Sequence, residues 1–358
     1  MSFSIGTKLK VTIFGQSHAV AVGVVLDGLP SGESIDLDEL QAFMQRRAPG
    51  HSSVSSARQE SDSFEVLSGL VNGRTCGAPL AMTIRNHDIR SEDYAKLRNV
   101  PRPSHADYPA SVKYGDSYDG RGGGQFSGRL TAPLCLAGGV CAQFLKRLDI
   151  QIAAHIQSIA GIQDRPIDAQ SVDIEALQVA AKEEIPALSS EAGKMMKQVI
   201  LDAKAAGDSV GGVVECAAIG LPVGLGEPIF GSLESRLAAA IFAIPAVRGI
   251  EFGSGFDAAQ MRGSRHNDPY ALGSDGQVVT TSNHHGGILG GLSTGMPLIL
   301  RVAFKPTPSI DMEQQSVDLV NRCETSLSIN GRHDPCIVPR AVPCVEAATA
   351  IVLMDATL

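Results

Sequence analysis

The sequence lacks several features that would place it in common classes of protein. It has no tryptophan, and aromatic residues make up only 4% of its 358 residues. It also has no excess of positive charge, because 30 Lys and Arg residues against 38 Asp and Glu residues leave a formal net charge of −8. A general nucleic-acid binder or a protein held on an anionic membrane needs a basic surface, so the charge argues against both classes.

Long hydrophobic runs are also missing. The main uncharged stretch lies between Arg129 and Lys146, and it falls short of the ~20 apolar residues that a membrane-spanning helix needs. Residues 1–10 show no basic segment followed by an apolar core, so we expect no secretory signal. Together these absences predict a cytoplasmic protein.

The seven cysteines form no C-x-x-C pair, and their number is odd. Without an export signal they are expected to be reduced and mostly buried thiols. A metal site would need closely spaced Cys and His pairs. His284 and His285 are adjacent, and neighbours on a strand point to opposite faces. We therefore expect no metal.

Apolar residues make up 44% of the chain, enough for a large core. The 38 glycines and 19 prolines exceed the share usual in proteins, and much of the excess falls in residues 120–128, 220–231 and 286–295, so it marks specific backbone sites. No low-complexity linker separates them. We therefore expect one domain over residues 1–358.

The hydrophobic pattern predicts both helices and short strands, as α+β proteins have. Helices are expected over 36–47 with Asp36 as N-cap, over 191–206 after Ser189, and over 232–244. Segments 129–148 and 345–354 are apolar nearly all round, which is typical of helices buried on every side. Strands are expected over residues 10–14, 21–26, 80–84, 213–219 and 298–304.

A short motif occurs twice. Gly28-Leu29-Pro30-x-Gly32 and Gly220-Leu221-Pro222-x-Gly224 each follow a Val-Val strand and precede an acidic helix start. Flanked by matching elements, the motif indicates an internal pseudo-repeat of two related halves, each supplying a sheet.

Five loops carry residues suited to chemistry. Gly122–Gly124 precede a helix, where backbone N–H groups can converge on an anion, although a tight turn without ligand is the alternative. His105 between a proline and a carboxylate, and His18 after a strand, are candidate proton donors or structural loop histidines. The loop 283–291 with Lys305 suits a phosphate or a flavin edge. The turn 331–336 suits either a surface salt bridge or an acid/base site.

These segments together resemble the chorismate synthase family. The resemblance covers the whole chain, in the family's order and spacing, through residues 15–18, 102–108, 121–132, 224–228, 283–291, 305–310 and 331–336. It implies a β-α-β sandwich with central helices between two antiparallel four-stranded sheets. It also implies a homotetramer, with which the low charge of residues 298–304 agrees.

The family's reaction is loss of phosphate and a ring proton from 5-enolpyruvylshikimate 3-phosphate to give chorismate, with reduced FMN required and no net oxidation. By this resemblance, His18 protonates the departing phosphate, and His105 stabilises the N1 and C2 carbonyl region of the flavin. Asp334 manages the proton at flavin N5, with Ser17 and Ser127 as relays.

The resemblance also implies the binding residues. Substrate carboxylates and phosphate need cations, and the matched positions are Arg46, Arg47, Arg121 and Arg129. FMN contacts are expected from Gln125, Phe126, Ser127, Gly290, Lys305, Pro306, Thr307, Pro308, Ser309 and Arg332. Arg47 also matches a position that contacts pyridine nucleotide (NADP) in the family.

Some positions depart from the family pattern. Gln16 replaces a usual Glu beside His18, and Ser53 stands where a second arginine is common, which weakens the case for direct NADPH binding. Reduced FMN is therefore expected from an external reductant or reductase. The alternative is a catalytically inactive flavin-binding relative, which the presence of His18, His105 and Asp334 disfavours. An ATP-dependent phosphoryl transferase would need a Walker-type lysine, and none appears.

Overall fold

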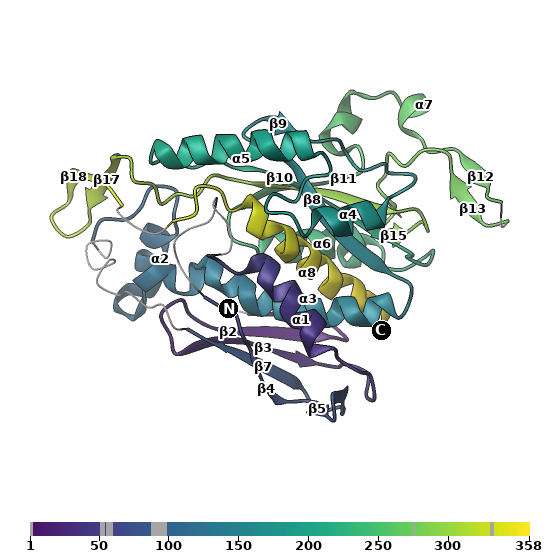
Figure 1. The fold of residues 1–358 in the computed structure, drawn as a ribbon, viewed down its shortest axis with the longest axis horizontal. Coiled ribbons are helices and arrows are strands. Elements are labelled where there is room, and N and C mark those ends of the chain that lie inside the picture. The colour runs from purple at the N-terminus through teal and green to yellow at the C-terminus, as the bar shows by residue number, and fades with distance from the viewer. Residues whose placement is uncertain (1–2, 51–53, 55–59, 87–98, 275, 330–332) are drawn as a thin grey trace.

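The computed structural model describes residues 3–50, 54, 60–86, 99–274, 276–329 and 333–358. Two antiparallel sheets enclose a layer of helices, seen edge-on in Figure 1. The first sheet has the order β1-β2-β3-β7-β4. Its strands are β1 (Ser4–Ile5), β2 (Lys10–Gly15), β3 (Ala21–Asp27), β7 (Leu80–Arg85) and β4 (Glu65–Ser68). The register places Val11 opposite Leu26, so one apolar face turns to the helices.

The second sheet has the order β11-β16-β10-β8-β9. Its strands are β11 (Val247–Phe252), β16 (Leu298–Phe304), β10 (Gly212–Ile219), β8 (Gln151–Ile159) and β9 (Ile162–Gln163). Read from the other edge, the four strands β8-β10-β16-β11 repeat the order β2-β3-β7-β4 of the first sheet, while the edge strands differ, because β1 precedes β2 in the chain and β9 follows β8. The predicted pseudo-repeat is therefore visible in the topology, and Gly28 and Gly220 end the equivalent strands β3 and β10, both at positive φ.

The helical layer between the sheets consists of α1 (Leu37–Arg47), α3 (Thr131–Lys146), α6 (Leu233–Phe242) and α8 (Val338–Thr357). Helix α3 packs on the first sheet and on α8, which packs on β8 and β10 of the second sheet. Both α3 and α8 are buried along most of their length, because apolar neighbours surround them. No helix in the described residues is long and apolar enough to cross a bilayer.

The remaining elements lie outside this sandwich. The helices are α2 (Asp107–Tyr114), α4 (Ile174–Ala180), α5 (Ser190–Ala205) and α7 (Gly263–His266). The two-stranded ribbons are β5 (Leu70–Val71) with β6 (Arg74–Thr75) and β12 (Tyr270–Leu272) with β13 (Val278–Thr280). Two further ribbons are β14 (Ile288–Leu289) with β15 (Leu292–Ser293) and β17 (Gln314–Asp318) with β18 (Cys323–Leu327). Figure 1 shows α5 over the outer side of the second sheet and the β12–β13 ribbon projecting from one end.

Three sequence predictions need correction. Each sheet has five strands and not four, because the two-residue strands β1 and β9 add to the edges and are too short to show a pattern. Strands β8 and β11 were not predicted. Helix α8 begins at Val338 rather than near residue 345, since it continues through Pro343, where the pattern alone indicates a break.

The caps and thiols agree with the predictions. Asp36 accepts hydrogen bonds from the backbone N–H groups of Asp38 and Glu39, and Ser189 caps α5 in the same way. Five of the seven cysteines are buried, Cys76 and Cys323 are exposed, and all are free thiols.

Candidate active site

A large cavity lies at the N-terminal ends of α3 and α8, where segments from both halves of the chain meet. Its volume is about 1130 Å³, slightly above the ~300–1,000 Å³ usual for ligand pockets. Among the described residues, six cationic side chains and two carboxylates line it: Arg47, Arg102, Arg129, Arg248, Lys305, Arg340, Glu60 and Asp334. This excess of cations, together with the positive ends of two helices, favours anionic ligands.

The glycine-rich loop packs directly against both candidate proton donors. A Cβ at Gly122 would lie 2.2 Å from Cε1 of His18, and a Cβ at Gly123 would lie 3.4 Å from Nε2 of His105. Both glycines also have positive φ, which L side chains rarely adopt. At Gly122 the imidazole of His18 occupies the space that a side chain would need, whereas at Gly123 the positive φ favours glycine and His105 lies at contact distance.

His105 is held by a fixed set of partners. Its Nδ1 lies 2.6 Å from Oδ1 of Asp107 and 3.1 Å from Nη2 of Arg102. Burial raises the pKa of the Asp107 carboxyl, but hydrogen bonds from Arg102 and His105 outweigh this effect and hold the pKa far below its usual range. Asp107 is therefore a carboxylate that fixes the imidazole through Nδ1 and leaves Nε2 facing the glycine loop.

The start of α3 is held by buried arginines. Asp62 accepts hydrogen bonds from Arg47 and Arg129, and Arg47 Nε also donates to Oγ1 of Thr131 at 2.9 Å. Burial raises the pKa of Asp62, but the two guanidinium groups outweigh this and lower it. Both arginines thus line the cavity while they already share the carboxylate of Asp62. Arg129 also pairs with Glu60, with Nη2 and Oε2 3.7 Å apart.

A second cationic corner has no carboxylate partner in the described part of the chain. It consists of Lys305, which follows β16, and Arg248 on β11. Burial and the neighbouring Arg248 lower the pKa of Lys305. Two like charges held side by side favour an anion between them.

Asp334 lies just before the N-terminus of α8. It accepts a hydrogen bond from Nη1 of Arg340, whose Nε donates to the backbone oxygen of Arg47 at 2.9 Å. Nearby, three buried polar atoms have no hydrogen-bond partner among the described residues: Ser17 Oγ, Thr307 Oγ1 and His333 Nε2. Orphaned polar atoms in a cationic cavity are the groups that a polar ligand satisfies.

The structure brings most of the predicted site residues to this cavity. Those that line it are Arg47, His105, Gln125, Phe126, Ser127, Arg129, Lys305, Thr307, Pro308, Ser309 and Asp334. Ser17 and His18 lie behind the glycine loop, in reach of Gly122. Arg332 and Ser53 fall outside the described residues.

Four predicted residues are not brought to the cavity wall. Arg46 pairs with Glu346 on α8 at 2.6 Å, and Arg121 is exposed and pairs with Asp119 at 2.8 Å. Gly290 lies in the β14–β15 turn, and Pro306 is not among the lining residues although its neighbours Lys305 and Thr307 are. A motif match alone does not separate these positions from those that face the ligand.

Several lining residues were missed by the sequence analysis. Arg248 and Arg340 stand in none of the matched segments, so no sequence signal marked them. Glu60, which lines the cavity, and Asp62, which pairs with two lining arginines, were missed for the same reason. They are recognised only through the arginines they pair with.

The His284–His285 pair lies differently from the expectation. The two residues are in a turn rather than a strand, and both Nδ1 atoms bond to Asp268, at 2.8 and 2.5 Å. The argument that they must point apart is therefore wrong. No group of three or more His, Cys, Asp or Glu side chains among the described residues is arranged to hold a metal ion.

Comparisons with known proteins agree on one family. The sequence model of the family "Chorismate synthase" matches residues 9–358. A chorismate synthase of Dehalococcoides mccartyi is 47% identical over 358 residues, covering 100% of this chain and 97% of the relative. One from Thermococcus gammatolerans is 46% identical over 350 residues, covering 98% and 96%.

Solved structures give the same answer. A structure described as a crystal structure of chorismate synthase superposes with a TM-score of 0.77 at 29% identity, covering 98% of this chain and 92% of that one. The chain therefore belongs to the chorismate synthase family, and it is a phosphate-eliminating lyase of the shikimate pathway.

Proposed function

We propose that the chain converts 5-enolpyruvylshikimate 3-phosphate to chorismate by a 1,4-elimination of phosphate and a ring proton, in the presence of reduced FMN. The observation that carries this proposal is the cationic cavity on which the loops of His18 and His105, the glycine loop and the segment 305–309 converge. Its size suits a cofactor and a substrate side by side.

The residues present fit FMN. The orphaned Thr307 Oγ1 and His333 Nε2 offer hydrogen bonds, and the Lys305–Arg248 corner suits a phosphate group. Phe126, packed near Tyr114 and Tyr118 at centroid distances of 6.4 and 6.3 Å, offers an aromatic wall. When bound, reduced FMN supplies an electron-rich partner that is regenerated in each turnover.

The chain's own groups handle charge and protons. His105, fixed by Asp107 through Nδ1, turns Nε2 toward the glycine loop at the cavity. His18, with Ser17 beside it, is the proposed acid for the departing phosphate. The carboxyl oxygens of Asp334, which accept a hydrogen bond from Arg340, are the proposed place where a proton is held. Ser127 accepts the N–H of Arg129 at 3.3 Å and keeps the start of α3 in position.

The arginines divide into two groups in this proposal. Arg47 and Arg129 already share Asp62, so they hold substrate carboxylates less strongly than an unpaired cation would. Lys305 and Arg248 share no carboxylate among the described residues, so they attract a phosphate group more strongly. Arg47 is 3% exposed, which leaves little surface for the contact with NADP that the family pattern implies.

The proposal extends to assembly and partners. It includes a homotetramer, a single domain over residues 1–358, a cytoplasmic location, and an external flavin reductase or reductant that delivers reduced FMN. One hydrophobic cluster that joins both sheets and the helical layer supports the single domain. Nucleic acid and membranes are not proposed as partners.

An anaerobic assay tests the reaction. With photoreduced FMN in catalytic amount, the purified protein should form chorismate and release one phosphate per product, without consuming reductant in stoichiometric amount. Oxidised FMN, kept oxidised in a parallel reaction, is the control and should give no product. Turnover without any flavin would contradict the proposal, and so would phosphate release without chorismate.

A further inference from the structure

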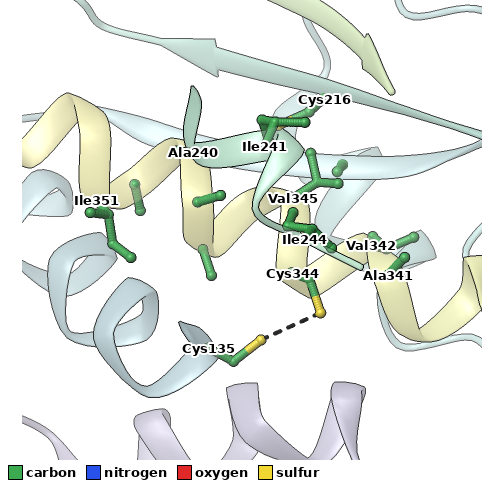
Figure 2. Packing of buried hydrophobic residues seen from close by; sticks show 14 of the residues in the cluster. Cys135, Cys216, Ala240, Ile241, Ile244, Ala341, Val342, Cys344, Val345 and Ile351 are labelled. Atoms are coloured by element: carbon green, nitrogen blue, oxygen red, sulfur yellow. Dashed lines mark hydrogen bonds between the residues drawn. The ribbon is translucent and has the colours of Figure 1, made fainter. Parts of the chain in front are cut away.

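Two cysteines meet where α3 packs against α8. Cys135 on α3 donates its S–H to Cys344 on α8, with the two Sγ atoms 3.7 Å apart (Figure 2). Figure 2 shows them pointing toward one another from facing helices, with apolar side chains such as Val345 nearby. Both are free thiols in the structure.

The backbones of the two helices are close enough for a covalent link. Gly138 and Ala347 lie three residues after Cys135 and Cys344, and a Cβ at Gly138 would be 2.2 Å from Cα of Ala347. The helices thus touch within one turn of the thiols. Closing the sulfurs from 3.7 Å to the ~2.05 Å of a disulfide needs a small side-chain rotation and no large movement of either helix.

The surroundings favour Cys344 as the reacting sulfur. The hydrogen bond from Cys135 lowers the pKa of the Cys344 thiol, and the charges of Arg47 and Arg340 lower it further against the effect of burial. Burial raises the pKa of Cys135. Cys344 is only 2% exposed, but it is part of the cavity lining, so a small oxidant in the cavity reaches it.

We propose that Cys135 and Cys344 form a reversible disulfide when hydrogen peroxide enters the cavity, which makes this pair an oxidative modification site at the floor of the active site. The Cys344 thiolate attacks one peroxide oxygen, the S–O bond forms as the O–O bond breaks, and the departing hydroxide takes up the proton that Cys344 released. Cys135 then attacks that sulfur, the S–S bond forms as the S–O bond breaks, and its proton leaves with the oxygen as water. Two thiols lose two electrons in total, and one peroxide is reduced to two waters.

Oxidation at this point affects groups that line the cavity. Cys344 lies one helical turn after Arg340, which pairs with Asp334 and donates to the backbone of Arg47. Arg47 in turn donates to Thr131 at the start of α3. The disulfide also removes the S–H of Cys344, which donates to the backbone oxygen of Arg340 at 3.3 Å, so it releases a contact of the helical turn that carries Arg340. We expect lyase activity to fall at least tenfold on oxidation, an effect that rests on the proposed function.

The test uses the full-length reduced protein, treated with hydrogen peroxide, then alkylated and digested for mass spectrometry. A peptide pair joined through Cys135 and Cys344, two hydrogens lighter than the separate thiol peptides, should appear and should vanish after dithiothreitol. Activity should fall and return in parallel. In Cys135→Ala, Cys344 should instead oxidise to sulfinic acid, and dithiothreitol should not restore activity.

Cys141→Ala is the matched control, because Cys141 is buried on the same helix and takes no part in the pair. It should behave as the wild type. Lack of the joined peptide at peroxide concentrations that oxidise the exposed Cys76 and Cys323 would overturn the proposal. The joined peptide is measured without flavin or substrate, so failure of the reduced protein to make chorismate would contradict the proposed function and leave this inference standing.

Discussion

His18 and His105 are distant from the glycine loop in sequence, yet each imidazole rests on a different glycine of it. A side chain at Gly122 or Gly123 would meet them at 2.2 and 3.4 Å. The loop therefore contacts both candidate acids and fixes the distance between them. Such an arrangement suits a reaction in which both imidazoles act on the bound ligands, whether by proton transfer or by hydrogen bonding.

Replacing either histidine with alanine tests that role. His18→Ala and His105→Ala should each lower kcat by ~10²–10⁴, the usual worth of a positioned acid or base. Circular dichroism should show an unchanged fold. His266→Ala is the control, because His266 packs against His284 and His285 outside the cavity. Less than a tenfold decrease in both variants would assign the two histidines a structural role.

Arg248 is one of the lining residues that only the folded structure points to. Together with Lys305 it forms a cationic corner without a carboxylate partner among the described residues. Arg248→Ala should weaken binding of a phosphate-bearing ligand roughly tenfold or more, since a charge-assisted hydrogen bond contributes about 1.5–3 kcal/mol.

Titration with FMN followed by flavin fluorescence, and KM for the substrate, measure the effect of Arg248→Ala. Arg265→Ala removes an exposed cation outside the cavity and should leave both values unchanged. Equal affinities in wild type and Arg248→Ala would show that phosphate binds elsewhere.

At the scale of elements, the contact of α3 with α8 fixes the cavity, because both helices begin at it. Gly138 permits that contact, since its missing Cβ would overlap Ala347. The periodic pattern predicted the buried helix of residues 129–148 but gave no sign of which partner it packs against. Helix α8 was predicted only in part, because Pro343 suggested a break that packing overrides.

Two glycine substitutions separate packing from helix propensity. Gly138→Ala should destabilise the protein by about 1–3 kcal/mol through overpacking. Gly193→Ala on the outer helix α5 should stabilise it by about 0.5–1 kcal/mol, because a Cβ there meets Ala187 at an ordinary 3.6 Å. Urea unfolding of both variants measures the difference. If Gly138→Ala gained stability as Gly193→Ala does, the close contact of α3 with α8 would be wrong.

At the scale of the whole molecule, the two sheets repeat one strand order around a common helical layer. The low charge of residues 298–304 needs no contact between subunits to explain it, because these residues form β16, a central strand of the second sheet that is mostly buried inside the chain itself. That segment therefore gives no independent support for assembly. The tetramer stays a prediction from the family alone.

Light scattering tests the assembly. The expected particle mass is four times the 37.5 kDa chain mass, and it should persist at micromolar concentration. The measurement should be repeated with FMN, because ligand binding that favours the assembled state raises its population. A monodisperse monomer in both conditions would contradict the homotetramer.

The sequence alone determined the features that depend on neighbouring residues. Asp36 and Ser189 cap helices because their side chains reach N–H groups two or three residues on. The glycine loop adopts positive φ because only glycine does so at little cost. The family match rests on the same local segments, and most of the site residues that it indicated line the cavity.

Only the tertiary structure decided which charged and sulfur-bearing groups meet. It placed Arg46 against Glu346 and Arg47 against Asp62, although the two arginines are adjacent in sequence. It also brought Cys135 within 3.7 Å of Cys344, 209 positions away. Such pairs depend on the packing of helices and sheets remote in sequence, and a spacing of residues along the chain contains no measure of that distance.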